Sequence, residues 1–146
     1  MDKNTLWSLR LGFSGKQSNA IEKIGLEKFL EKSFATSFDA SVPKLLDGSP
    51  KSIEELKEKR QILKSENPDK IKEMLKKEAQ VSFEMKAWWL EKMIESEFPL
   101  REKMTCFWHN HFVSTFQKVK VNYWIFQHNQ LLREHAFGNF KELTKR

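Results

Sequence analysis

The run NPDKIKEMLKKEAQVSFEMKAWWLEKMIES spans residues 67–96 and carries the clearest structural pattern of the chain. Asn67 can cap a helix, and Pro68 suits the first helical position because its missing amide donor costs nothing there. Apolar residues then recur at helical spacing: Ile71, Met74, Leu75, Val81, Met85, Trp88, Trp89 and Met93. This pattern predicts one long amphipathic helix from about Pro68 to Ser96, with its polar face toward solvent.

Short helices are expected before this run, each bounded by glycine. A helix at residues 4–11 is ended by Gly12. Ser18 is the expected N-cap of a helix at 19–24, which Gly25 closes in a left-handed conformation. The N-terminal part of the chain therefore predicts helices throughout.

A loop and a charged helix follow. Residues 36–51 collect Ser, Asp, Gly and two prolines, a composition typical of a loop. Ser52 and Glu55 then have the spacing of a capping box, in which each side chain binds an otherwise unpaired amide. They predict a charged helix that runs to about Ser65.

The C-terminal part predicts aromatic helices. Pro99 begins a helix on which six residues share one face: Leu100, Met104, Phe107, Trp108, His111 and Phe112. After a break at 113–121, Asn122 is the expected cap of a helix that runs to about Phe137 and ends at Gly138.

Two features predict that the chain stops within a larger helical domain. Asn139 is a start signal for another helix, yet the sequence ends at Arg146. The helix at 122–137 is apolar on both sides and so requires partners on both sides. Four apolar residues are therefore expected to be more exposed than Trp108: Phe126, Phe137, Phe140 and Leu143.

These signals together predict an all-α fold, an irregular array of about six helices that forms the N-terminal portion of a larger helical protein. We expect residues 1–146 to form a single helical segment, truncated within its domain. It comprises N-terminal helices at 1–35, a loop at 36–51, charged helices at 52–98 and aromatic, histidine-rich helices at 99–146.

Charge and hydropathy limit the classes of partner. The net charge is +6, and residues 101–146 hold 8 basic and 3 acidic groups. Because no Lys/Arg run is clustered, nucleic-acid binding is not expected, and weak binding of a polyanion remains an alternative. No run approaches the ~18 apolar residues of a membrane helix. The sequence therefore predicts a cytoplasmic protein, or an exported one if a natural signal has been removed.

Histidines provide the candidate site. All four lie near the C-terminus, and with one asparagine they form a candidate polar cluster: His109, Asn110, His111, His128 and His135. Converging neutral imidazoles are typical of three-histidine metal sites, whereas core or interface histidines bound to carbonyls are the alternative interpretation.

Helix geometry narrows the metal hypothesis. If the two helices that carry them pack antiparallel, His111 should lie closer to His128 than to His135, which is about 10 Å further along the axis. Two imidazoles alone make a weak metal site. We therefore expect no metal or other cofactor on this segment alone, with His111 and His128 as weak candidate ligands. The sequence identifies no catalytic residue.

Several motifs resemble one known family. Trp88-Trp89-Leu90 is followed by PLREKMTCFWHNHF at 99–112 and by NQLLREHAFGNFKEL at 129–143. Together with LRLGF at 9–13, these motifs resemble the domain of unknown function 1800 family of bacteria. The resemblance implies a full-length protein of several hundred residues whose later acidic, asparagine-rich motif is absent here. Members of the family are often exported, and the resemblance implies no established biochemical function.

The sequence thus leaves three functions open. The leading hypothesis is an uncharacterised helical segment that acts as a scaffold or interaction portion, without activity of its own, and whose partner is the missing C-terminal part of its own chain. The second is part of a metal-dependent enzyme whose remaining site residues lie beyond Arg146. The third is a weak polyanion-binding module.

Overall fold

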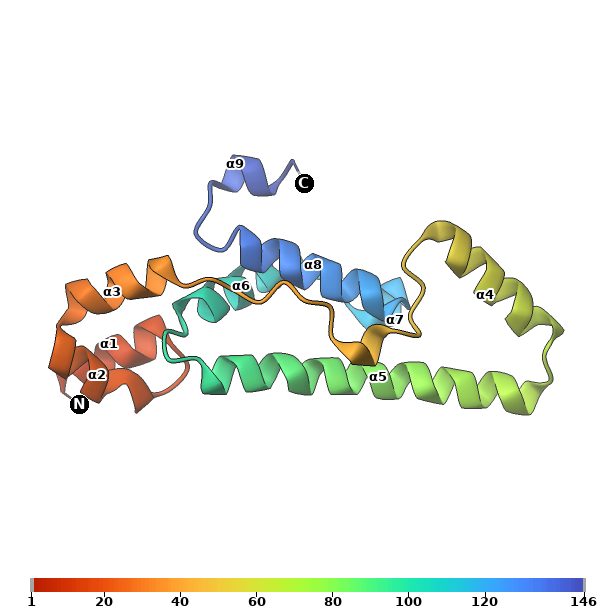
Figure 1. Ribbon diagram of the computed structural model, residues 1–146, viewed down its shortest axis with the longest axis horizontal. Helices are drawn as coiled ribbons and strands as arrows, with labels where there is room; N and C mark the ends of the chain where they lie inside the picture. Colours follow the sequence, from red (N-terminus) through yellow and green to blue (C-terminus); the bar gives the residue numbers. More distant parts are fainter. Residues whose placement is uncertain (1, 146) are drawn as a thin grey trace. The chain divides into compact units, whose positions relative to one another are not determined.

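The computed structural model describes residues 2–145, and Figure 1 shows that they form only helices, turns and loops. The chain is 74% helical, and no strand occurs between residues 2 and 145. The predicted all-α class is therefore confirmed. The predicted number of about six helices is wrong, because residues 2–145 contain nine α-helices and two short 3-10 helices. One source of the difference is a four-residue helix, α7 (Phe116–Val119), within the expected break at 113–121.

The chain divides into two compact units, which we describe separately. Unit 1 comprises residues 1–40, 89–113 and 129–146, and unit 2 comprises residues 41–88 and 114–128. Two helices, α5 (Pro68–Glu95) and α8 (Asn122–Glu134), contribute residues to both units. Among residues 2–145, no helix is both long and apolar enough to cross a membrane.

Unit 1 begins with three helices, α1 (Lys3–Leu11), α2 (Ser18–Ile24) and α3 (Leu26–Ala35). Asp2 caps α1, because its Oδ1 accepts hydrogen bonds from the backbone amides of Asn4 and Thr5 at 2.8 and 3.0 Å. The predicted role of Ser18 as an N-cap is wrong, since Ser18 is itself helical with φ −55°. A 3-10 turn immediately before it supplies the entry to α2.

Gly25 alone separates α2 from α3. Its φ is +82°, a region that residues with a Cβ seldom adopt, so the sequence needs glycine here to turn the chain within one residue. Its ψ of 153° lies outside the left-handed helical region that was predicted. The sharp turn lets Phe29 of α3 become fully buried, with its ring 5.2 Å from that of Phe98.

The remainder of unit 1 comes from the end of α5, from α6 (Leu100–His111), from the end of α8 and from α9 (Phe140–Leu143). Asn139 caps α9 as predicted, and its Oδ1 accepts from the Lys141 amide at 2.8 Å. Between α8 and α9, a turn at residues 135–137 precedes Gly138.

Unit 2 contains α4 (Ile53–Ser65), most of α5, α7 and the beginning of α8. Asn67 caps α5 as predicted, accepting from the Lys70 amide at 2.9 Å. Ser52 accepts from the Glu55 amide at 3.1 Å, and the Glu55 carboxylate accepts from the amide of Lys51 at 2.7 Å. The capping box therefore forms, but its return bond reaches one residue further back than predicted.

The core of unit 2 is formed by Leu46, Met85 and Phe126, with Trp88 packed against it. Asn122 is the first helical residue of α8 and not its cap, because its side-chain amide donates to the Glu78 carboxylate and backbone carbonyl at 3.0 Å. The predicted capping role of Asn122 is therefore wrong.

The predicted exposure of four C-terminal apolar residues is correct only in part. Phe140 is 51% exposed, but Phe126 and Leu143 are 3% and 6% exposed, which makes both more buried than Trp108. Phe126 is buried because the Trp88 ring lies 5.6 Å from it within unit 2. The second apolar side of α8 thus finds a partner within the chain.

Replacing Phe29 tests the core of unit 1. Phe29→Ala should lower the free energy of unfolding by about 3–5 kcal/mol, because it removes a fully buried ring and leaves a cavity. Phe34→Ala, on the same helix but 55% exposed, should cost about 1 kcal/mol. Urea unfolding followed by circular dichroism measures both, and equal losses would contradict the placement of Phe29.

Candidate functional site

A buried carboxylate lies at the centre of unit 1. The guanidinium of Arg133 on α8 donates to Glu102 of α6 through Nε to Oε1 at 2.8 Å and through Nη2 to Oε2 at 2.9 Å. Arg133 is 1% exposed and Glu102 is 7% exposed. This bidentate geometry is the strongest form of an arginine–carboxylate pair. Trp89 of α5 adds a third bond from its indole Nε1 to Oε2 at 3.0 Å.

Further bonds fix the same helices. The Nη1 of Arg133 donates to Gln130 Oε1 at 2.7 Å, which holds the guanidinium against its own helix. The indole Nε1 of Trp108 donates to the Ala136 carbonyl at 3.3 Å. Three segments far apart in sequence, around Trp89, Glu102 and Arg133, therefore meet at one carboxylate.

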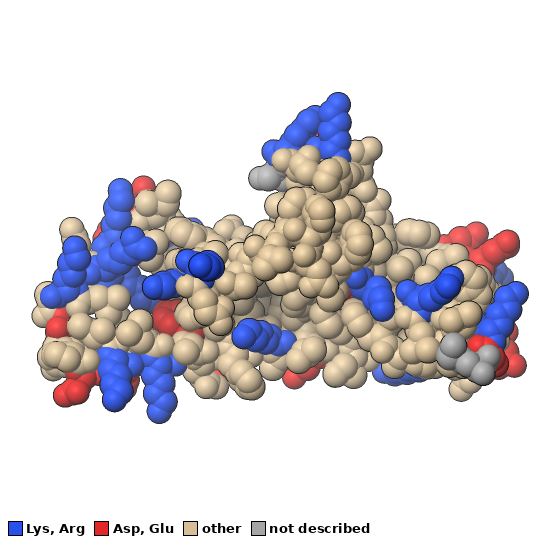
Figure 2. Space-filling view, turned by 180° about the vertical axis from the view of Figure 1, so that it is seen from behind, with Lys and Arg blue, Asp and Glu red and all other residues tan. Residues whose placement is uncertain are grey.

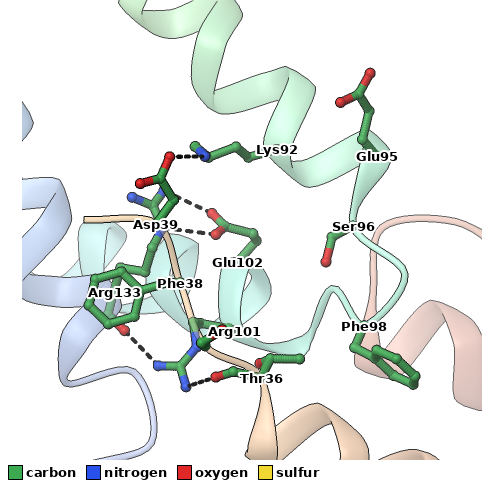
Figure 3. A pocket seen from close by; sticks show the side chains of 11 residues that line it. Thr36, Phe38, Asp39, Lys92, Glu95, Ser96, Phe98, Arg101, Glu102 and Arg133 are labelled. Carbon is green, nitrogen blue, oxygen red and sulfur yellow. Dashed lines mark hydrogen bonds and ion pairs between the residues drawn. The ribbon is translucent and has the colours of Figure 1, made fainter. Parts of the chain in front are cut away.

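A pocket of about 310 Å³ opens beside this pair, within unit 1 (Figure 3). The residues that line it come from the loop after α3, the end of α5, the connection from α5 to α6, the beginning of α6, and α8: Thr36, Ser37, Phe38, Asp39, Lys92, Glu95, Ser96, Phe98, Arg101, Glu102 and Arg133. Lys92 and Asp39 face each other across it at 4.0 Å, the outer limit for an ion pair. The pocket is small and rich in charge.

Arg101 is the most constrained cation of the pocket. Its guanidinium lies 5.4 Å from the centre of the Phe38 ring and 4.7 Å from that of Phe137. It donates to the carbonyls of Thr36 and Arg133 at 2.7 and 3.0 Å, and Figure 3 shows both bonds. Burial lowers the pKa of Arg101, the nearby Glu102 carboxylate opposes that shift, and the Arg133 charge adds to it.

The buried face of α6 differs from the predicted one. Leu100 is buried as expected, but its buried neighbours are Glu102 and Thr105, while Phe107 is 56% exposed. The prediction counted apolar residues only, and the ion pair with Arg133 turns the polar side of the helix inward. The aromatic residues of α6 consequently form a surface.

We name this surface the aromatic cluster: Phe107, Trp108, His111, Phe112 and Phe140. The Trp108 and Phe140 rings stack at 5.7 Å, and Phe112 stacks on each of them at 6.2 Å. Phe107 meets Trp108 edge-on at 5.0 Å, and His111 meets Phe112 edge-on at 4.8 Å. The cluster therefore joins the end of α6 to α9.

The family described as "Protein of unknown function (DUF1800)" matches residues 5–146 of this chain. The chain belongs to this family. No curated protein and no solved structure matches it. The expected family membership is therefore confirmed, and the motifs that suggested it gain a physical role, since Trp89, Glu102 and Arg133 belong to three of them.

The histidines of this DUF1800 chain lie in different surroundings. His109 is half-buried with its ring 5.2 Å from that of Trp89, whereas His111 is exposed within the aromatic cluster and Asn110 is exposed beside it. His128 belongs to α8 in unit 2, and His135 lies in the turn after α8 in unit 1. Between residues 2 and 145, no three His, Cys, Asp or Glu side chains are grouped so that they could hold a metal ion. The relative distances of His111, His128 and His135 stay a prediction.

Sequence reasoning did not identify Glu102, Arg133 or Arg101 as site residues. Helical periodicity counts apolar positions, and a buried ion pair between two residues 31 positions apart leaves no periodic signal. The signal that was present is the resemblance, because the quoted motifs contain all three residues.

Breaking the central pair should destabilise unit 1. Glu102→Gln removes the bidentate carboxylate partner of the buried Arg133 and should lower the free energy of unfolding by about 3–5 kcal/mol. Glu142→Gln is the matched control, since it breaks an exposed pair with Lys145 and should cost less than about 1 kcal/mol. The double variant Glu102→Gln/Arg133→Met should recover part of the loss in urea unfolding. A Glu102→Gln protein as stable as the control would refute the central role of the pair.

His109 should make stability depend on pH. Burial lowers the pKa of the His109 imidazole below its ordinary value of 6.5. The unfolded chain therefore binds a proton at pH values where folded His109 remains neutral, so acidification favours unfolding. The urea midpoint should fall between about pH 7.5 and about pH 5.5, and His109→Asn should reduce this fall. His111→Asn, with an exposed ring, is the control, and equal slopes in His109→Asn and wild type would contradict this assignment.

Proposed function

We propose that this DUF1800 chain is a helical interaction module that binds a protein partner through the aromatic cluster. The exposure of the cluster carries the proposal. Phe107 is 56% exposed, Phe140 is 51% exposed and the adjoining Val113 is 69% exposed. Contiguous exposed apolar surface of this kind marks interaction sites, and buried aromatic side chains dominate the binding energy of protein interfaces.

The side chains of the cluster are also held in place by contacts within unit 1. The Trp108 indole donates to the Ala136 carbonyl at 3.3 Å, and its ring stacks on Phe112, directly after α6, and on Phe140 of α9. Rigid rings lose little conformational entropy on binding, which favours affinity. The ion pair of Glu102 with Arg133 supports this arrangement, because it fixes α6 against the end of α8.

The charge around the cluster defines the partner's chemistry. Lys141 and Lys145 are exposed on and after α9, where Lys145 pairs with the exposed Glu142 and Lys141 adds a further positive charge. Figure 2 shows cationic side chains at the outer end of this segment. A complementary partner therefore presents an apolar pocket or groove with acidic residues at its rim. Acidic groups there speed association more than they increase affinity.

A site-specific crosslink tests the proposal. A photoreactive phenylalanine analogue at position 140, in cells that make the protein, should give one discrete protein adduct. The same analogue at Phe83 is the control, because that ring is 68% exposed on α5 outside the cluster. Adding Phe107→Ser should reduce the adduct at position 140 about fivefold or more, the loss typical of a hot-spot residue.

The result can contradict the proposal in two ways. Equal adducts at positions 140 and 83 mean nonspecific contact, and an adduct that Phe107→Ser leaves unchanged excludes the cluster as the docking surface. Peptide mapping of the adduct identifies the partner segment and shows whether it carries the predicted acidic residues.

A further inference from the structure

A second pocket lies in unit 2, and none of the residues that line it belongs to the aromatic cluster. It has a volume of about 440 Å³, and most of the residues that line it belong to α4, α5 and α7, which Figure 1 labels. Pockets of about 300–1,000 Å³ are the size that small-molecule ligands occupy.

The interior of this pocket is apolar. Leu56 and Leu63 of α4, Leu75 of α5 and Phe116 of α7 line it. Leu75 remains 60% exposed, so this part of the lining is open to solvent. Such a surface favours an aliphatic or aromatic group of a ligand, since burial of apolar area provides the binding energy.

Cations without acidic partners line the same pocket. Arg60 and Lys120 both face it, and neither forms an ion pair with any acid among residues 2–145. A third cation, Lys59, is paired with Glu78, whose carboxylate also accepts a bond from Asn122 at 3.0 Å. Lys59 and Glu78 also line the pocket, where their charges offset each other. The pocket therefore retains the two positive charges of Arg60 and Lys120 for a ligand.

The backbone at Lys120 supports a functional role for this side chain. Its φ is +58°, the sole positive value for a non-glycine residue within the described part of the chain. The conformation closes α7, because the Lys120 amide donates to the Phe116 carbonyl at 2.8 Å. Glycine or asparagine closes a helix in this way at lower cost. Lysine at this position places a cation at the pocket. Non-glycine residues with a positive φ occur preferentially at functional sites such as ligand sites.

We propose that this pocket binds a single-chain aliphatic carboxylate, a ligand of the fatty-acid class. The tail lies among Leu56, Leu63, Leu75 and Phe116, and the carboxylate accepts from Arg60 and Lys120. The guanidinium provides the paired donors that match a carboxylate. This binding activity is separate from the proposed protein interaction, because the two sites share no residue.

A chain-length series tests the tail. Isothermal titration of the intact chain with octanoate, decanoate, dodecanoate and tetradecanoate, each below its micelle concentration, should show saturable binding at one site. Affinity should rise up to about fourfold for each added methylene and then level off when the tail fills the pocket. Acetate should not bind measurably. Leu75→Gln should weaken dodecanoate and leave the chain folded, since Leu75 is largely exposed.

Paired variants test the head group. Arg60→Gln/Lys120→Asn should weaken dodecanoate by about two- to fivefold for each cation removed, with dodecanol unchanged. Asparagine is chosen at position 120 because it tolerates a positive φ. Lys57→Gln/Lys64→Gln, which removes two cations of α4 that do not line the pocket, is the matched control and should bind as wild type.

Three outcomes would overturn the proposal. They are the absence of saturable dodecanoate binding, equal affinity for dodecanoate and dodecyltrimethylammonium, and equal losses in the two double variants. The last of these outcomes would show that net charge and not this pocket attracts the anion.

Discussion

The pair between Glu102 and Arg133 governs the arrangement of unit 1. Neither charge is stable alone in a buried environment, and together they form two short bonds between α6 and α8. Trp89 adds the contribution of α5, so one carboxylate connects three helices. Because the pair draws the polar side of α6 inward, the aromatic residues of that helix turn to the surface. The position of the aromatic cluster at the surface thus follows from the ion pair in the interior.

The burial of the polar side of α6 is the part of the fold that the sequence could not predict. Elements defined by local chemistry were found correctly, such as α5 after its Asn67 cap and α9 after Asn139. The burial of α6 was predicted incorrectly, because hydrophobic periodicity treats Glu102 as a solvent-facing residue. Glu102 can be buried only because the Arg133 guanidinium pairs with it, and this pairing depends on the tertiary structure.

Capping residues show the same distinction. Ser18 and Asn122 have suitable side chains for a cap, yet Ser18 follows a 3-10 turn and Asn122 donates to Glu78 across unit 2. The local sequence favours a capping role for both side chains, but the structure around each of them gives it a different role. For the candidate site, the sequence indicated four histidines because imidazoles can bind metals. The structure instead indicates arginines and aromatic rings, whose roles depend on the residues around them.

The division of the sequence between the two units has a consequence for synthesis on the ribosome. Unit 2 ends at residue 128, while unit 1 still lacks residues 129–146, which include Arg133. At about 5–20 residues per second, the N-terminal helices wait about 5–20 s for the arginine that neutralises Glu102. Unit 2, whose segments lie between those of unit 1 in the sequence, is therefore the first unit that can fold completely. During that interval α1, α2 and α3 have left the ribosome without residues 129–146, which complete unit 1. A chaperone that binds exposed apolar surface would act mainly in this period.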